Sequence, residues 1–425
     1  MASTEFSPDP DGAQALDAED EFAGLRRRFH VPKAGTRPAI YLCGHSLGLM
    51  PRRTREVLDV ELDRWAERAV EGHFGADGWL DYHARFSEPL AKLIGAHAGE
   101  VVAMNTLTAN LHLMLVSFFR PDKVRYKIVI ERGAFPSDRY AVQSQLQFHG
   151  LDPGEAMLEL APAPGSGLLN PAGLKKLLDS EGERVALVLL PGVQYLTGQA
   201  LHLRAYSDIA RRFGCRIGFD LAHAIGNVPL AVHDSGTDFA VWCSYKYLNG
   251  GPGAVAGCFV HERWANARDL PRFAGWWGHD KQSRLRMATE FSAIPGAEGW
   301  QLSNPPVLSL APLAASLEIF AAAGIDRLRR KSERLTAYLE FLLRTEFGER
   351  IEILTPSRAA DRGCQLSLKL RGPAAAGAAI LERLRSSGVI ADWRPPNIVR
   401  FAPVPLYNSY CDVFEAVRAL KRALG

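Results

Sequence analysis

The strongest constraint on the fold of this chain is a repeated alternation of short apolar runs with segments of helical periodicity. The apolar runs lie at residues 101–104, 127–131, 185–190, 216–219, 239–244 and 255–260. Short continuous apolar runs are typical of strands that are buried on both faces. Strands that alternate with helices predict an α/β fold with a mostly parallel sheet and helices on both sides. Ligands of such sheets bind beyond the carboxyl ends of the strands.

The pattern changes after residue 306, which indicates a second domain. Two long helical segments, at 308–323 and 325–346, lead away from the sheet region. Shorter elements follow, namely strands at 351–354, 365–370, 389–393 and 398–401, a helix at 374–386, and a final helix capped by Asn408 or Ser409. We expect four parts, namely a flexible arm at 1–20, a segment at 21–60 that packs with the smaller domain, a large domain at 61–310 and a small α/β domain at 311–425.

Composition excludes several classes of protein. Hydrophobic residues make up 47% and charged residues 23%, as in an ordinary globular protein, and a net charge of +3 is too small to indicate nucleic-acid binding. Neither a secretory signal nor an apolar run of membrane-spanning length is visible, so we expect no membrane partner. The six cysteines form no CxxC pair, which predicts reduced thiols in the cytoplasm and no metal site.

Two charged residues follow neighbouring strand-like runs in the most informative part of the chain. Asp220 ends one run and Lys246 ends the next, so both should face the same crevice. A lysine flanked by Tyr245 and apolar residues would be partly desolvated, which favours the neutral amine that forms an imine. Asp220 is the carboxylate that a pyridoxal ring nitrogen requires. Taken singly, Lys246 could be a surface lysine and Asp220 a helix cap.

Two further turns could bind the rest of such a cofactor. Residues 105–108, Asn-Thr-Leu-Thr, offer hydroxyls and backbone N–H groups at the start of a helix, which suits a phosphate. Residues 135–138, Phe-Pro-Ser-Asp, open the next helix, and Phe135 could lie flat on an aromatic ring. Each turn alone is equally consistent with an ordinary helix cap.

Several longer motifs resemble those of the kynureninase family. They lie at residues 41–48, 105–112, 135–138, 197–199, 219–224, 242–249, 275–279, 303–306 and 400–408. The resemblance extends from about residue 41 to the final helix. It implies a homodimeric fold type I (aminotransferase-like) enzyme that uses pyridoxal 5'-phosphate. Such an enzyme hydrolyses L-kynurenine, and often 3-hydroxy-L-kynurenine, to the anthranilate and L-alanine, in tryptophan degradation and NAD biosynthesis.

The resemblance also implies a role for individual residues. Lys246 matches the lysine that holds the cofactor covalently, Asp220 the partner of its ring nitrogen, and Tyr245 another cofactor contact. From its place beside Lys246, Tyr245 is also a candidate catalytic proton donor or shuttle, although a hydrogen bond to the phosphate is its simpler role. Other cofactor contacts are implied for Leu107, Thr108, Phe135, Ser137, Asp138, His223, Trp276 and Asn304. Arg400 matches the arginine that binds the substrate carboxylate, and His73, Ser303 and Asn304 match residues around the aromatic end of the substrate.

Two positions depart from the family pattern, and other functions remain open. His45 stands where the family usually has Asn, and Pro191 stands where a hydroxyl is usual, so one cofactor hydrogen bond must be absent or supplied by a neighbour. A cysteine desulfurase or an aminotransferase would use the same lysine and aspartate. A cofactor-binding regulator would need a helix-turn-helix, for which the roughly 40 residues before the resemblance are too few. No GxGxxG motif supports a nicotinamide dehydrogenase.

Overall fold

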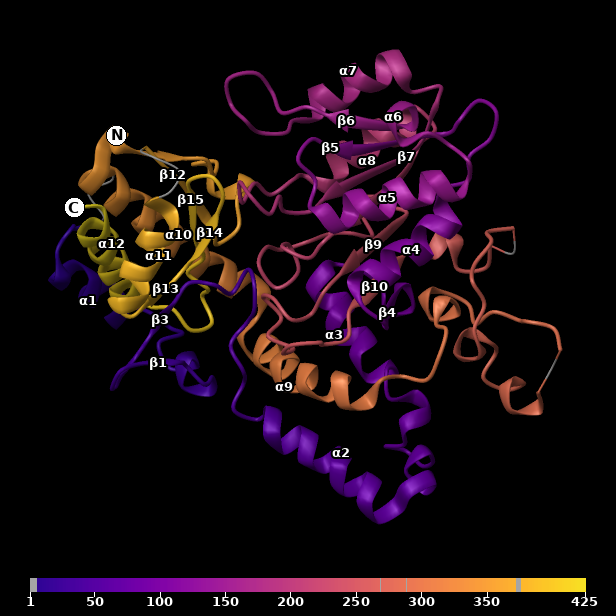
Figure 1. Cartoon of the computed structure of the whole chain (residues 1–425). Coiled ribbons are helices and arrows are strands. Elements are labelled where there is room, and N and C mark those ends of the chain that lie inside the picture. The colour runs from indigo at the N-terminus through magenta and orange to yellow at the C-terminus, as the bar shows by residue number, and fades with distance from the viewer. Residues whose placement is uncertain (1–5, 268, 288, 372–375) are drawn as a thin grey trace.

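A large, mostly parallel sheet forms the centre of the molecule (Figure 1). The computed structural model describes residues 6–267, 269–287, 289–371 and 376–425. Within these ranges, seven strands form the sheet in the order β4 (Val101–Ala103), β10 (Gly257–Val260), β9 (Phe239–Trp242), β8 (Arg216–Asp220), β7 (Val185–Pro191), β5 (Lys127–Glu131) and β6 (Met157–Leu160). Neighbours from β9 to β6 are parallel, whereas β10 is antiparallel to both β9 and β4. The expected sheet is therefore confirmed.

Successive side chains of the central strands enter two different hydrophobic cores. In β5, Val129 packs in one core, whereas Ile128 and Ile130 pack in the other. In β7, Val188 packs in the same core as Val129, and Leu187 packs in the same core as Ile128 and Ile130. Because strand side chains alternate between the faces of a sheet, both faces are buried. This double burial explains why the strand sequences are continuously apolar rather than alternating.

Helices cover both faces of the large sheet. One face carries α4 (Leu107–Phe118), α5 (Pro136–Phe148) and the short α6 (Pro153–Ala156). The other face carries α3 (Ala84–Ile94), α7 (Pro171–Glu181), α8 (Leu203–Arg212) and α9 (Val307–Ala323). Helix α2 (Thr54–Arg68) lies outside this layer, against α9 (Figure 1).

A smaller antiparallel sheet forms a second unit beside the first. Its strands are β11 (Ile351–Ile353), β12 (Leu366–Leu370), β15 (Ile398–Phe401) and β14 (Asp392–Arg394). The helices around it are α10 (Ile325–Phe347), α11 (Ala376–Ser386) and α12 (Tyr410–Leu424), with Ser409 as the N-cap of α12. Residues 374–375 of the helix expected at 374–386 lie outside the described residues. Two small pairings complete the strands, β1 (Lys33–Ala34) with β2 (Arg37–Pro38) and β3 (Ile40–Tyr41) with β13 (Val389–Ile390).

Residues 6–20, the described part of the arm expected at 1–20, contain a helix. Residues 10–18 form α1 (Pro10–Ala18), which Asp9 caps by accepting the backbone N–H of Gly12. Leu16 of α1 is buried in the core of the small unit. The Asp17 carboxylate accepts the backbone N–H groups of the first two residues of α12, where the helix dipole favours a negative charge. These contacts fix the segment against α12.

Short 3₁₀ helices connect many of these elements. They are η1 (Leu25–Arg28), η2 (Ala69–His73), η3 (Trp79–Asp81), η4 (Ala98–Glu100), η5 (Glu262–Trp264), η6 (Trp276–Gly278), η7 (Arg284–Arg286), η8 (Ala297–Trp300), η9 (Gly348–Arg350) and η10 (Ala359–Asp361). Among the described residues, no single helix is long and apolar enough to cross a membrane, although α9 and α10 would pass that test together despite an 82° bend between them.

Candidate active site

A pocket lies at the carboxyl edge of the large sheet. Asp220 is the last residue of β8, and Lys246 lies in the loop that follows β9, so both enter the pocket from adjacent strands. The residues that line it are Leu107, Thr108, Glu131, Phe135, Ser137, Asp138, Pro191, Val193, Tyr195, Asp220, Ala222, His223, Tyr245 and Lys246. Nine of the residues implied by the sequence are thus brought together, and the parallel topology is what aligns them.

The amine of Lys246 faces aromatic rings on two sides. Its Nζ lies 5.8 Å from the ring centroid of Phe135 and 5.8 Å from that of Tyr245. Phe135 in turn makes an edge contact with Tyr195, with ring centroids 5.3 Å apart. Desolvation raises the pKa of Tyr245, so its hydroxyl keeps its proton at neutral pH. The lysine therefore has a proton donor beside it and limited access to water.

Three carboxyl groups crowd the same pocket. Burial raises the pKa of Glu131, at the end of β5, to about 8. Desolvation, and then the charge of Asp220, raises the pKa of Asp138 well above its usual range. Desolvation also raises the pKa of Asp220, but less, because Lys246 and a hydrogen bond from Asp138 favour its charged form. Asp138 is accordingly the protonated member of the pair and donates to Asp220, which retains the negative charge.

His223 contributes an unpaired nitrogen to the pocket. Its ring is 8% exposed, and its Nδ1 has no hydrogen-bond partner among the described residues. Burial, reinforced by the charge of Lys246, lowers the pKa of His223 well below its usual range, so the ring is neutral. A buried polar atom without a partner is costly. A bound group that hydrogen-bonds to His223 would remove this cost.

Two helices point their N-termini at the pocket from the same side. Thr108 lies in the first turn of α4 and Ser137 in the first turn of α5, and their hydroxyl oxygens are 2.7 Å apart. The N-cap residue of α4, Thr106, makes no side-chain hydrogen bond to its own helix. The first N–H groups of α4 and the two hydroxyls therefore form a cradle for an anion. Together with Lys246, Asp220 and His223, the cradle fits pyridoxal phosphate.

Arg400 is buried where the small sheet meets the pocket wall. Its side chain is 1% exposed, and its Nη1 donates to the backbone oxygen of Tyr195 at 2.6 Å. Its Nη2 is paired with Asp392, while its Nε has no partner in the described structure. Burial lowers the pKa of Arg400 to about 10, so the guanidinium remains charged at neutral pH. Arg400 thus lies behind Tyr195 rather than in the wall itself.

His45, one of the two departures from the family pattern, belongs to the same network. Its buried Nε2 lies 3.2 Å from the Asp392 carboxylate. Burial, and then the charges of Arg400 and Lys246, lowers the pKa of His45 well below its usual range. A neutral His45 that carries its proton on Nε2 donates to Asp392. Asp392 therefore accepts from both His45 and Arg400.

Pro191, the other departure, lines the pocket at the end of β7. It pairs in register with Asp220, and the next residue, Gly192, donates its N–H to the Asp220 backbone oxygen at 2.7 Å. The proline therefore leaves this strand pairing intact. It offers neither a hydroxyl nor an N–H to a bound cofactor.

Besides Arg400, four of the implied residues do not reach this pocket. Trp276, in η6, is 44% exposed and donates its Nε1–H to the backbone oxygen of Arg284. Ser303 and Asn304 are exposed in the segment before α9. His73 lies at the end of η2, with its ring against Trp79. His73 and residues 305–309 line a separate groove.

Sequence reasoning missed two polar pocket residues. Glu131 ends β5 as Asp220 ends β8, so its place at a strand end was a usable signal. Tyr195 lies four residues beyond β7 in a loop, where no periodicity indicates which side chains turn inward. Its backbone oxygen also accepts from Arg400, so it connects the pocket to the small sheet.

Comparison with known proteins assigns the chain to a family. A kynureninase from Xanthomonas campestris pv. campestris (strain B100) is 54% identical over 406 residues, which are 95% of this chain and 96% of that protein. A kynureninase from Myxococcus xanthus (strain DK1622) is 54% identical over 96% of each chain. The family profile described as the kynureninase C-terminal domain matches residues 328–420. The chain belongs to the kynureninase family.

Solved structures with low sequence identity support the fold of this kynureninase-family chain. A cysteine desulfurase from Thermococcus onnurineus NA1 has a TM-score of 0.74 at 18% identity and covers 90% of this chain and 94% of its own. A cysteine desulfurase from Escherichia coli has a TM-score of 0.76 at 17% identity and covers 95% and 98%. The predicted family, its C–C hydrolase activity, the fold type I architecture and the pyridoxal phosphate cofactor are therefore confirmed.

Replacement of Lys246 by Ala should abolish covalent attachment of the cofactor. No other lysine lines the pocket within the described residues, so borohydride reduction should leave no pyridoxal label on the protein, and turnover should be lost. The fold should persist, because Lys246 belongs to no hydrophobic core. Peptide mass spectrometry of the reduced protein measures the label. Lys175→Ala, at an exposed lysine of α7, is the control that should retain it. A label on another lysine would contradict the site.

Replacement of Arg400 by Lys should weaken substrate binding selectively. A lysine retains the charge but cannot donate to both Tyr195 and Asp392 or present a forked contact to a carboxylate. The KM for kynurenine should rise about 100-fold, which is about 2.7 kcal/mol, with cofactor content unchanged. Arg394→Lys, at the more exposed partner of Asp392, should change KM by only a few-fold. Equal effects of the two substitutions would contradict the role of Arg400.

Proposed function

We propose that this enzyme hydrolyses the Cβ–Cγ bond of L-kynurenine and of 3-hydroxy-L-kynurenine, with Lys246, Asp220 and Tyr245 as its catalytic residues. The observation that carries the proposal is the joint presence, in one pocket, of an amine, a charged carboxylate and an anion cradle. The curated kynureninases at 54% identity support the choice of substrate. The products are the corresponding anthranilate and L-alanine.

The cofactor, when bound, supplies an electron sink conjugated to the substrate α-carbon. Asp220 holds a proton on the ring nitrogen, and Asp138 supports the charge of Asp220 by donating a hydrogen bond. Leu107, Thr108 and Ser137 bind the phosphate at the two helix N-termini. Phe135 packs on the ring, and His223 uses its unpaired Nδ1 as a hydrogen-bond partner.

Proton transfer falls to Lys246 and Tyr245. The amine of Lys246 takes the proton from the substrate α-carbon and returns it. Water then adds to the γ-carbonyl, and as the hydrate loses one hydroxyl proton to solvent, the Cβ–Cγ bond breaks to leave the carboxylic acid of the anthranilate and an electron pair on Cβ. The Tyr245 hydroxyl, which keeps its proton at neutral pH and lies on the residue next to Lys246, then protonates Cβ. The family pattern assigns the substrate carboxylate to Arg400, whose Nε is the one donor of its guanidinium left without a partner in the described structure.

Incubation of the purified holoenzyme with each kynurenine tests this function. We expect equimolar anthranilate and alanine from kynurenine, and 3-hydroxyanthranilate and alanine from the hydroxylated substrate. Chromatography of the products measures both. Alanine formed from cysteine instead, with release of sulfur, would identify a desulfurase and refute the proposal.

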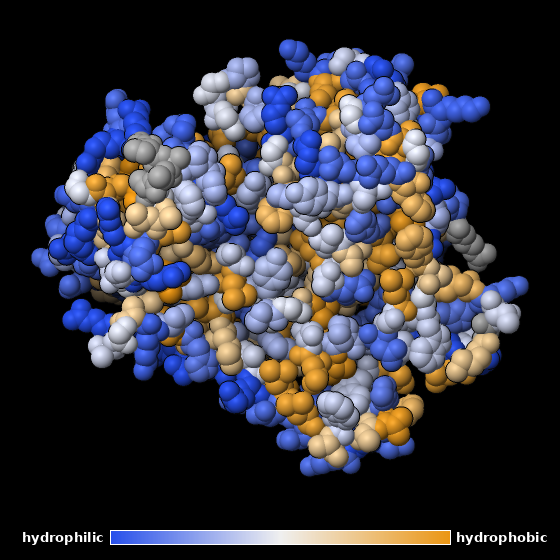
Figure 2. Space-filling view, viewed as in Figure 1, coloured by the Kyte–Doolittle hydropathy of each residue, from blue (hydrophilic) through white to orange (hydrophobic). Residues whose placement is uncertain are grey.

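We also propose a homodimer in which each subunit completes the site of the other. Trp276, His73, Ser303 and Asn304 do not line the pocket of their own chain, although the family pattern assigns them to cofactor or substrate. Exposed hydrophobic residues surround them, namely Trp65, Val70, Phe74, Leu285, Phe291 and Leu308. Figure 2 shows hydrophobic residues gathered over the lower part of the view, where Figure 1 places α2 and α9. An exposed hydrophobic surface of this kind favours association with a second copy of the chain.

Mixing two inactive variants tests shared sites. Lys246→Ala removes the amine, and Asn304→Arg adds a bulky charge at an exposed position that its own fold tolerates. If Asn304 acts in the site of the neighbouring subunit, each mixed dimer has one intact site, so co-refolded variants should recover about a quarter of normal activity. If Asn304 acts in the site of its own subunit, no activity returns. A fully active monomer in sedimentation would also refute the proposal.

The polar residues that the family pattern assigns to the aromatic end of the substrate favour 3-hydroxykynurenine over plain kynurenine. His73, Ser303 and Asn304 offer hydrogen-bonding groups where a ring hydroxyl would project, and a site that leaves such groups unpaired discriminates against the plain substrate. The kcat/KM ratio for the two substrates should therefore shift towards plain kynurenine in the His73→Trp, Asn304→Thr double variant. A wild-type preference for plain kynurenine that the double variant leaves unchanged would contradict this assignment.

We place the enzyme in the cytoplasm, in tryptophan degradation by the kynurenine pathway and in the supply of precursors for NAD biosynthesis. Support comes from the unpaired cysteines of the described structure and from the curated kynureninases. We propose neither a nucleic-acid nor a membrane partner.

A further inference from the structure

Three histidines and two glutamates gather at the edge of the large sheet opposite the lysine pocket. Glu100 directly precedes β4, His261 and Glu262 directly follow β10, His233 lies in the loop before β9, and His97 precedes η4. Because β10 is antiparallel to its neighbours, it ends at the edge where β4 and β9 begin. The pocket lies at the other edge, where β8 and β9 end. The cluster is therefore separate from the residues assigned to catalysis.

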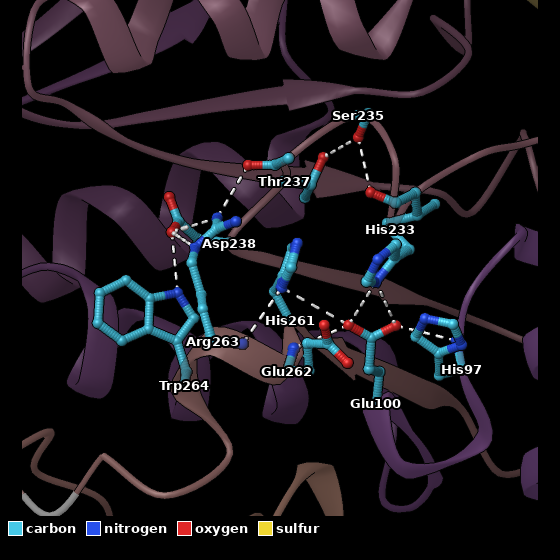
Figure 3. Close-up of polar contacts among 12 residues, drawn as sticks. His97, Glu100, His233, Ser235, Thr237, Asp238, His261, Glu262, Arg263 and Trp264 are labelled. Carbon is cyan, nitrogen blue, oxygen red and sulfur yellow. Dashed lines mark hydrogen bonds and ion pairs between the residues drawn. The ribbon is translucent and has the colours of Figure 1, made fainter.

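The Glu100 carboxylate is the centre of this cluster, with His97, His233 and His261 around it (Figure 3). Its side chain is 2% exposed, and its two oxygens accept the backbone N–H groups of His97 at 2.9 Å and Glu262 at 2.8 Å. Nδ1 of His233 lies 2.9 and 3.1 Å from the two oxygens, and Nδ1 of His261 lies 3.6 Å from Oε1. The backbone donors fix the carboxylate and leave lone pairs that face the imidazoles.

His261 faces the carboxylate with a lone pair rather than a proton. Its Nδ1 accepts the backbone N–H of Arg263 at 3.3 Å, so in this arrangement Nδ1 carries no hydrogen. The 3.3 Å hydrogen bond from Arg263 is long, so an ion beside the carboxylate oxygen that took this lone pair would displace only a weak contact. Arg263 does not fill this place, because its guanidinium is bound to Asp238 at 2.7 Å.

We propose that Glu100, His233 and His261 form a binding site for one divalent transition-metal ion such as Zn²⁺. Their ligand atoms lie within 4.8 Å of one another. Tetrahedral ligands at roughly 2.0–2.1 Å from zinc are about 3.4 Å apart, so small side-chain rotations close the site. Two imidazoles and a carboxylate suit zinc, cobalt and nickel better than calcium or magnesium. The ion takes the place between His233 Nδ1 and Glu100, and a His233 ring that binds it through Nδ1 carries its proton on Nε2.

The outer part of the cluster completes the site. His97 and Glu262 lie on the exposed side, and they form a second compact group with His233. The carboxylate of Glu262 adds negative charge near the ion, and the His97 ring packs edge-on against His233 with centroids 4.3 Å apart. A bound ion would connect the segment before β4, the loop before β9 and the end of β10. It should therefore stabilise the amino-terminal edge of the sheet.

Zinc titration of the holoenzyme tests this site. The protein is produced without a histidine tag, treated with a chelator and titrated with Zn²⁺ in a calorimeter. We expect one ion per chain, a rise in melting temperature, and at least tenfold weaker binding in His261→Gln. His30→Gln, at an exposed histidine on the N-terminal segment, is the matched control and should bind as the wild type does. With Co²⁺ as the probe, visible d–d absorption of tetrahedral intensity should appear in the wild type and not in His261→Gln.

Two further variants keep the proposal open to refutation. His97→Gln changes an exposed ring outside the proposed ligand set, and we expect only a few-fold loss of affinity. If His97→Gln abolishes binding and His261→Gln does not, the ion is held by the outer group and the assignment is wrong. Unsaturable binding, or equal affinity in the wild type, His261→Gln and the folded Glu100→Gln variant, would refute the site altogether.

Discussion

The constraint on which the site depends is charge balance at the carboxyl edge of the large sheet. Glu131, Asp138 and Asp220 enter one pocket in which Lys246 is the only lysine among the described residues. Their desolvation raises all three pKa values, so Glu131 and Asp138 take up protons and only Asp220 keeps its charge readily. An isolated buried carboxylate would be strongly unfavourable. The pocket is therefore built for a ligand that carries a positive charge towards Asp220 and a negative charge towards the helix N-termini.

A second constraint fixes the loop after β7 between the two sheets. Backbone oxygens in a loop cannot pair within a sheet, so they must find other donors. The backbone oxygen of Tyr195 accepts from Arg400 at 2.6 Å and from Gln365 at 3.0 Å, and that of Thr197 accepts from Thr355 at 2.6 Å. All three donors belong to the small unit. The small sheet thereby holds one wall of the pocket, and substrate binding at Arg400 is coupled to the position of that wall.

The parts of the site that sequence could predict are those set by local structure. Lys127–Glu131 and Arg216–Asp220 are strands because apolar runs of that length fit a sheet buried on both faces, and the polar residue that ends each run must then lie at its edge. Tyr195 could not be found in this way, because it lies in a loop whose backbone is bonded to Arg400, about 200 residues away in the sequence. The same limit applies to Glu100, His233 and His261, whose proximity arises only from the pairing of β4, β10 and β9.

The two departures from the family pattern are accommodated by different physical means. His45 is larger than Asn and fully buried, yet Asp392 accepts its Nε2–H, and its low pKa keeps a second charge out of the neighbourhood of Arg400. Pro191 offers no new hydrogen-bond partner, but it is the last residue of β7. The following residue, Gly192, makes the hydrogen bond to the neighbouring strand β8. The neutral His45 thus donates a hydrogen bond to Asp392, the carboxylate that orients Arg400. Pro191, in contrast, only leaves the pairing of β7 with β8 intact. In this chain, a neighbouring pocket group must supply the hydrogen bond that a hydroxyl at position 191 would give to the cofactor. The Tyr195 side chain is such a group, because it lines the pocket from the loop that follows Pro191.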